Sequence, residues 1–308
     1  MLKIDAHVHV IETIAGFGGR GELRGCGGGK ARWADGEEIS LIPPDLGDRG
    51  FSYEALVSLL DKNGVEKAIL LQGSMYGFQN DYTWEAARRY PGRLIPSATV
   101  DPFCANAEAL LERYLGERKI PVVKFEVSSG GGLMGYHRVF PLDGPPIAAL
   151  YPAINKAGAA LVLDIGSPGM GSFQIEAVAA AAKRYPQMRI IVCHLLAPRP
   201  ADEEVFTAAL KALAFPNLWF DLAALPWNAA GPDAYPYPTS LCFIGLAKKI
   251  LGAGKLLWGS DVPITLTRET YARQMSYLEE SGVFSDAELE KVFRTNAETA
   301  YALDKRTG

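Results

Sequence analysis

The chain has 308 residues, of which 48% are hydrophobic and 21% are charged, a balance typical of a globular protein with a sizeable core. Its formal charge of −4 provides no basic field to hold a polyanion, so nucleic acid is not expected as a partner. No apolar run reaches the roughly 18 to 20 residues of a membrane span, and no signal peptide is evident. The four cysteines form no CxxC pair, which argues against a disulfide framework and favours a reducing cytoplasm.

Short runs rich in Val, Ile and Leu alternate with amphipathic stretches, the pattern of parallel strands covered by crossover helices. Eight such runs lie at residues 3–10, 67–73, 94–102, 122–128, 160–166, 189–195, 218–225 and 255–263. Between them, apolar residues at three- and four-residue steps predict helices, for example at 53–64, 105–117 and 173–186. This order predicts an α/β fold, a (β/α)8 TIM barrel that forms a single domain over residues 1–308.

A glycine-rich segment, residues 11–50, follows the first predicted strand. Its GFGGRG at 16–21 has the G-x-G-x-x-G spacing of dinucleotide-binding proteins, but more glycine follows instead of a helix with a periodic apolar face. We therefore interpret 11–50 as a long loop insertion on the barrel face where active sites are assembled. Residues 20–32 hold four cations, Arg20, Arg24, Lys30 and Arg32, and one acid, Glu22. This patch either attracts a carboxylated substrate or is simply solvated.

A second mouth loop is predicted at 225–240, which is rich in proline and aromatic residues. Trp227, together with Tyr235 and Tyr237, either walls a planar substrate or packs to hold this loop in place. We select Trp227 as a candidate substrate-binding residue.

Two histidines stand one residue apart in the first predicted strand, in IDAHVHV at residues 4–10. Side chains at i and i+2 of a strand point to the same face about 6.6–7 Å apart, so His7 and His9 can converge on one ion inside the barrel. The alternative is a pair of hydrogen-bonded polar residues near a strand end.

Other predicted strands also end in ionisable residues among apolar neighbours, namely Lys124, Asp164, His194, Asp221 and Asp261. Burying a charge without a partner costs several kcal/mol, so we expect these groups to contact each other or a metal. The carboxyl ends of the strands are where barrel enzymes keep their chemistry.

IDAHVHV, the strand-borne His194, LWGSDVP at 257–263 and NAETAYAL at 296–303 resemble the amidohydrolase superfamily. More narrowly, they resemble its amidohydrolase-related branch, which contains aminocarboxymuconate semialdehyde decarboxylase, resorcylate-type decarboxylases and small lactonases. The likeness covers essentially the whole chain. It implies that His7 and His9 bind a divalent metal and that Asp261 ligates it and exchanges a proton with the attacking water. It also implies that His194 acts as acid or base, or polarises the substrate.

One position departs from this branch, whose fifth strand typically carries another metal-binding histidine where this chain has Asp164. A carboxylate can still ligate, so the expected ligands are His7, His9, Asp164 and Asp261 around one divalent ion. Zinc is the first expectation, with manganese or iron(II) as alternatives.

Lys124 is a second candidate substrate-binding residue, because it could pair with a substrate carboxylate. Pairing with Asp164 or Glu126 is the other interpretation of this lysine. In some branches of the superfamily a carboxylated lysine on the fourth strand bridges two ions, which is a further alternative for Lys124.

The leading hypothesis is a metal-dependent hydrolase of a small cyclic amide, lactone or carboxylated ring compound, in which the metal activates water. The alternative is a non-oxidative decarboxylase of an aromatic or enol acid that uses the same site. A third hypothesis, from another class, is a binding protein that has lost the metal. Barrels of this branch are often dimers, so the resemblance allows a homodimer.

Overall fold

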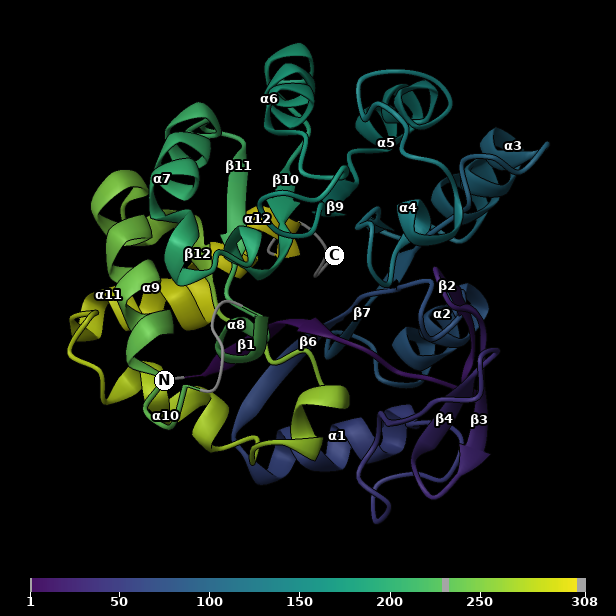
Figure 1. The fold of residues 1–308 in the computed structure, drawn as a ribbon, viewed down its shortest axis with the longest axis horizontal. Coiled ribbons are helices and arrows are strands. Elements are labelled where there is room, and N and C mark those ends of the chain that lie inside the picture. The colour runs from purple at the N-terminus through teal and green to yellow at the C-terminus, as the bar shows by residue number, and fades with distance from the viewer. Residues whose placement is uncertain (1, 229–232, 304–308) are drawn as a thin grey trace.

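The computed structural model describes residues 2–228 and 233–303. Eight parallel strands lie side by side in chain order and form a barrel, so the predicted TIM-barrel fold is confirmed (Figure 1). The strands are β1 (Lys3–Val8), β6 (Val65–Leu70), β7 (Leu94–Ala98), β8 (Val122–Glu126), β9 (Ala160–Asp164), β10 (Ile190–Val192), β11 (Leu218–Asp221) and β12 (Leu256–Leu257). Each falls within, or within two residues of, a run selected from the sequence.

The barrel closes where β1 meets the segment that follows β12. Val8 and Val262 form a parallel bridge, and the His9 amide donates to the Val262 carbonyl at 2.8 Å. In the other direction, the Asp261 amide donates to the His7 carbonyl at 2.8 Å. The two histidines and Asp261 therefore stand on the seam between the first and last strands.

The helices lie mostly around the ring of strands, with α8 and α12 over its middle in this view (Figure 1). They are α1 (Tyr53–Lys62), α2 (Asn80–Arg89), α3 (Ala107–Glu112), α4 (Leu133–Tyr136), α5 (Tyr151–Ala157), α6 (Ile175–Arg184), α7 (Glu203–Ala212), α8 (Leu225–Asn228), α9 (Pro238–Leu251), α10 (Arg273–Glu279), α11 (Asp286–Glu290) and α12 (Asn296–Tyr301). The helix predicted at 105–117 is α3 continued by a π-helical turn, Arg113–Glu117. Within the described residues, none of these helices combines the length and the apolar character needed to cross a membrane.

The start of α1 shows how the sequence sets a helix boundary. Ser52 has extended backbone dihedrals, and its side chain accepts a hydrogen bond from the Ala55 amide at 3.2 Å. Such an N-cap satisfies one of the amides that the first turn leaves without an intrahelical partner. Leu56 and Leu60 lie four residues apart on the buried face of the helix.

We predicted a loop for the glycine-rich insertion, and this was wrong. The structure shows a four-stranded antiparallel sheet there. Its strands are β2 (Ala15–Gly18), β3 (Gly21–Gly27), β4 (Lys30–Trp33) and β5 (Glu38–Ser40), and β2 contacts α4 (Figure 1). The alternation is short and carried partly by glycine, as in AGFG with its exposed–buried–exposed–buried pattern. Few apolar side chains therefore marked these strands in the sequence.

The cationic patch expected in this insertion is largely neutralised by ion pairs. Arg20 lies 2.6 Å from both Asp35 and Glu37. Arg32 pairs with Glu38, its register partner across β4 and β5. The patch therefore offers little free charge to a carboxylated substrate.

Apolar and polar residues occupy different parts of the barrel strands. A buried cluster joins strand residues such as Val122 and Val162 to Ala297 and Tyr301 of α12. The Tyr301 hydroxyl donates to the Ala6 carbonyl at 3.2 Å, which ties this last helix to β1. The polar residues instead stand at the carboxyl ends of the strands, where they form the site.

Candidate active site

A cavity of about 390 Å³ opens at the carboxyl ends of the strands. Six of the seven residues selected from the sequence line it: His9, Lys124, Asp164, His194, Trp227 and Asp261. The seventh, His7, is fully buried behind them. Residues that lie far apart in the sequence are therefore brought to one site.

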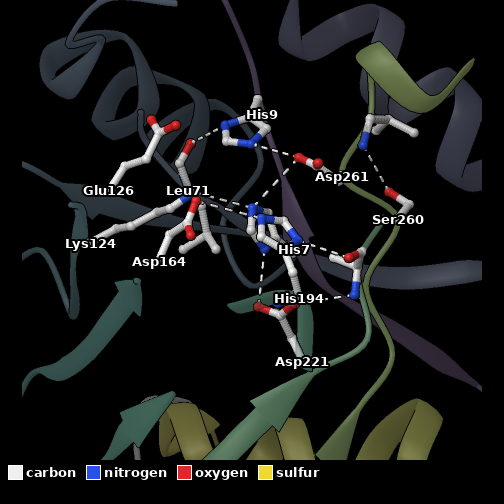
Figure 2. Close-up of polar contacts among 12 residues, drawn as sticks. His7, His9, Leu71, Lys124, Glu126, Asp164, His194, Asp221, Ser260 and Asp261 are labelled. Atoms are coloured by element: carbon white, nitrogen blue, oxygen red, sulfur yellow. Dashed lines mark hydrogen bonds and ion pairs between the residues drawn. The ribbon is translucent and has the colours of Figure 1, made fainter. Parts of the chain in front are cut away.

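The site centres on His7, His9 and Asp261 (Figure 2). Nε2 of His9 lies 3.0 Å from Oδ1 of Asp261, and Nε2 of His7 lies 3.6 Å from the same oxygen. One ligand atom from each of the three residues lies within 4.8 Å of the other two. Burial on its own would raise the pKa of Asp261, but the His9 hydrogen bond and the nearby imidazoles hold that pKa well below its usual range. Asp261 is therefore ionised.

Fixed oxygen acceptors hold the second ring nitrogen of both histidines. Nδ1 of His7 lies 3.1 Å from Oδ2 of Asp221, and Nδ1 of His9 lies 3.0 Å from the Leu71 carbonyl oxygen. With a cation bound, a hydrogen on Nδ1 would leave the Nε2 lone pair of each ring free to ligate, which is the usual outer-shell arrangement of metal-binding histidines. Burial lowers the pKa of both imidazoles, which favours the neutral form that ligates a cation. This donor set fits a divalent cation.

The backbone around Asp261 explains why a glycine precedes it in the GSD motif. A Cβ atom at Gly259 would lie 2.8 Å from Cβ of His7, so glycine allows this segment to approach β1 closely. Asp261 itself has a φ of 61°, in the left-handed region that costs free energy for a residue other than glycine. Asp5 secures the segment by accepting from the Ser260 amide at 2.9 Å.

Lys124 points into the same group from β8 (Figure 2). Its Nζ lies 3.2 Å from Nε2 of His7. Burial opposes the lysine charge, but the surrounding acidic groups raise its pKa, so the ammonium group is charged. The pairings that we considered with Asp164 and Glu126 are not among the ion pairs of the described residues. Lys124 instead contacts His7 and would compete with a cation for its Nε2 lone pair.

His194 is not on a strand, contrary to prediction. Strand β10 ends at Val192, and the next residues turn with left-handed dihedrals, φ being 57° at His194 and 48° at Leu195. The carboxylate of Asp221 accepts from the His194 amide at 2.8 Å and stabilises this turn. The predicted strand 189–195 was therefore too long. After Val192 the His194 amide bonds to a side chain instead of to the backbone of a neighbouring strand.

The His194 ring is fixed with Nδ1 2.8 Å from the Ala223 carbonyl oxygen and Nε2 3.8 Å from Oδ2 of Asp164. Burial lowers the pKa of His194, but the charges of Asp164 and Asp261 outweigh burial and raise it above its ordinary value. Asp164 thus lies beside His194 and outside the group of His7, His9 and Asp261. Its role as a metal ligand stays a prediction.

A second group of close ligand atoms comprises His7, Cys193 and His194. Cys193 is buried, and burial raises the pKa of its thiol well above the usual value. Because the thiolate is the form that binds metals, this group is the weaker candidate.

A family model described as amidohydrolase matches residues 4–303. The chain belongs to the amidohydrolase family. This confirms the family predicted from the sequence. L-fucono-1,5-lactonase of Burkholderia ambifaria is 30% identical to this amidohydrolase over 249 residues, which cover 76% of this chain and 78% of the relative.

Solved structures share the barrel fold of this amidohydrolase. A probable 2-pyrone-4,6-dicarboxylic acid hydrolase from Acinetobacter baumannii has a TM-score of 0.69 at 18% identity, covering 98% of this chain and 100% of its own. An amidohydrolase from Burkholderia multivorans with bound zinc has a TM-score of 0.68 at 18% identity, covering 98% and 99%. More distantly, 5-carboxyvanillate decarboxylase from Sphingomonas paucimobilis has a TM-score of 0.56 at 14% identity, covering 80% and 82%.

Three residues of the amidohydrolase site were not assigned a role from the sequence. Asp221, which holds His7 and the His194 amide, had been noted only as an acid at a strand end. Glu126 had been considered only as a partner of Lys124; it lines the cavity and accepts from the Ser74 amide at 2.9 Å. Tyr76 lies in the segment between β6 and α2, where no motif marks it, and lines the cavity too.

The aromatic residues of the second mouth loop divide between the two interpretations. Trp227 lines the cavity. The hydroxyl of Tyr235 contacts Ser276 and Glu280, and that of Tyr237 donates to Glu269, so these two tyrosines hold the loop in place. Residues 229–232 of this loop lie outside the described residues.

Proposed function

We propose that this amidohydrolase is a metal-dependent lactonase that opens a small, hydroxylated lactone, with L-fucono-1,5-lactone as the first candidate. The observation that carries the proposal is the convergence of His7 Nε2, His9 Nε2 and Asp261 Oδ1 on one point beside the cavity. The similarity to the Burkholderia ambifaria lactonase supports the same reaction class.

His7, His9 and Asp261 would hold one divalent cation. Two imidazoles and a carboxylate form a donor set well suited to zinc, and carboxylate ligation also suits manganese or iron(II). When bound, such a cation supplies Lewis-acid polarisation of a carbonyl and a lowered pKa for a water molecule. The zinc found in the Burkholderia multivorans barrel supports zinc as the first candidate.

Asp261 and His194 then divide the proton transfers. The ionised Asp261 accepts a proton from the water whose oxygen attacks the lactone carbonyl carbon. The bond between that carbon and the ring oxygen breaks, and the ring oxygen receives a proton from Nε2 of His194. Because Nδ1 of His194 is held by the Ala223 carbonyl, its second proton faces the cavity. Asp164 favours the protonated imidazole.

The cavity wall suits a hydroxylated substrate. The acidic residues Glu126, Asp164 and Asp261 line it together with the basic residues Lys124, His194 and Arg199. Carboxylates accept hydrogen bonds from hydroxyl groups, and ammonium and guanidinium groups donate to hydroxyl oxygens. Trp227 would pack against the carbon face of the sugar.

Decarboxylation is the second candidate, because His194 lines the cavity and its raised pKa favours a protonated imidazole there. A protonated imidazole in the cavity could deliver its proton to a ring carbon as carbon dioxide leaves. The distant structural likeness to 5-carboxyvanillate decarboxylase supports the compatibility of the fold with such a reaction.

The test is to load the purified protein with zinc and offer it aldonolactones and hydroxybenzoates in parallel. Acid release from L-fucono-1,5-lactone in a weakly buffered indicator assay, without carbon dioxide from the aromatic acids, supports the lactonase. Carbon dioxide release alone would support the decarboxylase. A protein that takes up less than about a tenth of an equivalent of metal would instead agree with the binding-protein hypothesis. Light scattering of the same sample tests the expected homodimer.

A further inference from the structure

Tyr76 carries a buried hydroxyl that has no hydrogen-bond partner among the described residues. The residue is only 3% exposed. Several buried side-chain atoms in the described part of the chain have no hydrogen-bond partner. Among them, only the Tyr76 hydroxyl belongs to a residue that lines the 390 Å³ cavity. A buried hydroxyl left unpaired costs free energy, so its retention in a catalytic cavity requires an explanation.

The ring of Tyr76 stands against the predicted metal site. It packs edge-on against His9, with the ring centroids 4.9 Å apart. The phenol hydroxyl can donate a hydrogen bond, and it belongs to a residue that lines the cavity beside His9 and Asp261.

The inserted sheet holds the segment that carries Tyr76. The Ala15 amide donates to the Tyr76 carbonyl at 3.1 Å, and the Phe17 amide donates to the Ser74 carbonyl at 2.9 Å. Strand β2 therefore runs along residues 74–76.

Gly16, between these two contacts, has no room for a side chain, because a Cβ atom there would overlap the Met75 carbonyl. The glycine of the insertion lets β2 approach this segment closely.

We propose that Tyr76 is a substrate-contacting residue whose hydroxyl donates a hydrogen bond to the lactone group at the His9–Asp261 wall, and that the inserted sheet positions it. This rests on the proposed lactonase function. The insertion then acts as a support for one wall of the active site, and its glycines reflect the close packing of β2 on the segment 74–76.

Tyr76→Phe removes one oxygen atom and keeps the ring against His9. We expect kcat/KM for L-fucono-1,5-lactone to fall by about 10- to 100-fold, the effect of losing one hydrogen-bond donor in an active site. Zinc content should be unchanged, and the urea midpoint should stay the same or rise, because an unpaired buried hydroxyl is removed.

Tyr151→Phe is the matched control. The buried hydroxyl of Tyr151 donates to the Leu142 carbonyl at 2.9 Å and does not line the cavity. Its loss should lower the urea midpoint and leave kcat/KM unchanged. Without a substrate contact, Tyr76→Phe would leave kcat/KM unchanged. Only a substrate contact would lower kcat/KM without lowering the urea midpoint.

Gly16→Ala tests the support. It should lower kcat/KM in the wild-type background and add little to Tyr76→Phe, since both changes remove the same contact. Gly245→Ala, where a Cβ atom would meet nothing within 4 Å, controls for the substitution. A folded Gly16→Ala variant with wild-type kcat/KM would overturn the support by the sheet.

The outcomes distinguish this proposal from the function on which it rests. If the wild type opens lactones and Tyr76→Phe opens them equally fast, the substrate contact is wrong and the lactonase stands. If Tyr76→Phe loses zinc, Tyr76 acts through His9 and the substrate contact is again wrong. If the zinc-loaded wild type opens no lactone, the lactonase fails and the proposed contact fails with it.

Discussion

Nε2 of His9 lies 3.0 Å from Oδ1 of Asp261, although 252 residues separate them in the sequence. The hydrogen bonds that close the barrel between β1 and the segment after β12 bring them together. The candidate metal site is therefore part of the closure of the fold. The Leu71 carbonyl also holds the His9 ring, and the Ser260 hydroxyl accepts from the Val262 amide at 3.2 Å and so holds the turn around Asp261.

The first prediction concerns the two histidines of β1. The double variant His7→Ala, His9→Ala should bind less than about a tenth of an equivalent of zinc and lose turnover, because two of three ligands are gone. Circular dichroism should show a folded barrel. His137→Ala is the control. Nε2 of His137 lies 2.8 Å from Oδ2 of Asp101, and the residue does not line the cavity, so its loss should leave zinc in place. Full activity in the double variant would contradict the assignment.

The second prediction concerns the acceptor behind His7. Asp221→Asn should weaken zinc binding by about 10- to 100-fold, the usual effect of changing an outer-shell partner of a metal-binding histidine. The reason is that the asparagine oxygen would accept from the amides of His194 and Ala223, so its NH₂ group would face Nδ1 of His7 and could not accept the hydrogen there. Competition with a chromogenic chelator measures the change. Unaltered zinc affinity would show that Asp221 serves only the His194 turn.

The third prediction uses Lys124 to separate two interpretations of that residue. Its ammonium lies 3.2 Å from Nε2 of His7 and repels a cation, so Lys124→Met should tighten zinc binding by at least about tenfold. The KM for the lactone should rise if Lys124 also contacts substrate. Loss of zinc in this variant would instead indicate a carboxylated lysine that serves as a ligand.

The fourth prediction concerns stability against pH. Burial and the nearby carboxylates raise the pKa of Glu126 from 4.5 to about 7. Between these values the folded protein holds a proton that the unfolded chain has lost, so stability falls as pH rises towards 7. The contribution is about 1–2 kcal/mol after allowance for partial exposure.

Glu126→Gln should remove this contribution and flatten the dependence. Urea unfolding with a chelator present, compared with the wild type at pH 5, 6, 7 and 8, measures it. Parallel curves for the two proteins would show that Glu126 is ionised throughout.

Much of the barrel could be predicted because its strands are short apolar runs in chain order. The site could be placed because His7, His9 and Asp261 occupy strand ends, which parallel strands gather at one face. The left-handed turn at His194 could not be foreseen, because it depends on Asp221, which is distant in sequence. The inserted sheet escaped prediction because its pairing, such as Arg32 with Glu38, depends on register rather than on an apolar pattern.

Tyr76 shows a second limit of sequence reasoning. Nothing in GSMYGFQ distinguishes a cavity tyrosine from one packed in a core. Its position follows from the pairing of β2 with its backbone, a contact across 61 residues between Ala15 and Tyr76. Residues placed by a distant insertion need a structure to be found.

The most direct test of the account is a crystal structure of the zinc-loaded protein recorded on both sides of the zinc absorption edge. The account predicts one anomalous peak about 2.0–2.2 Å from Nε2 of His7, Nε2 of His9 and a carboxylate oxygen of Asp261. The same map would show whether Asp164 reaches the ion or stays beside His194. A peak bound elsewhere, with His9 and Asp261 still hydrogen-bonded directly to each other, would contradict it.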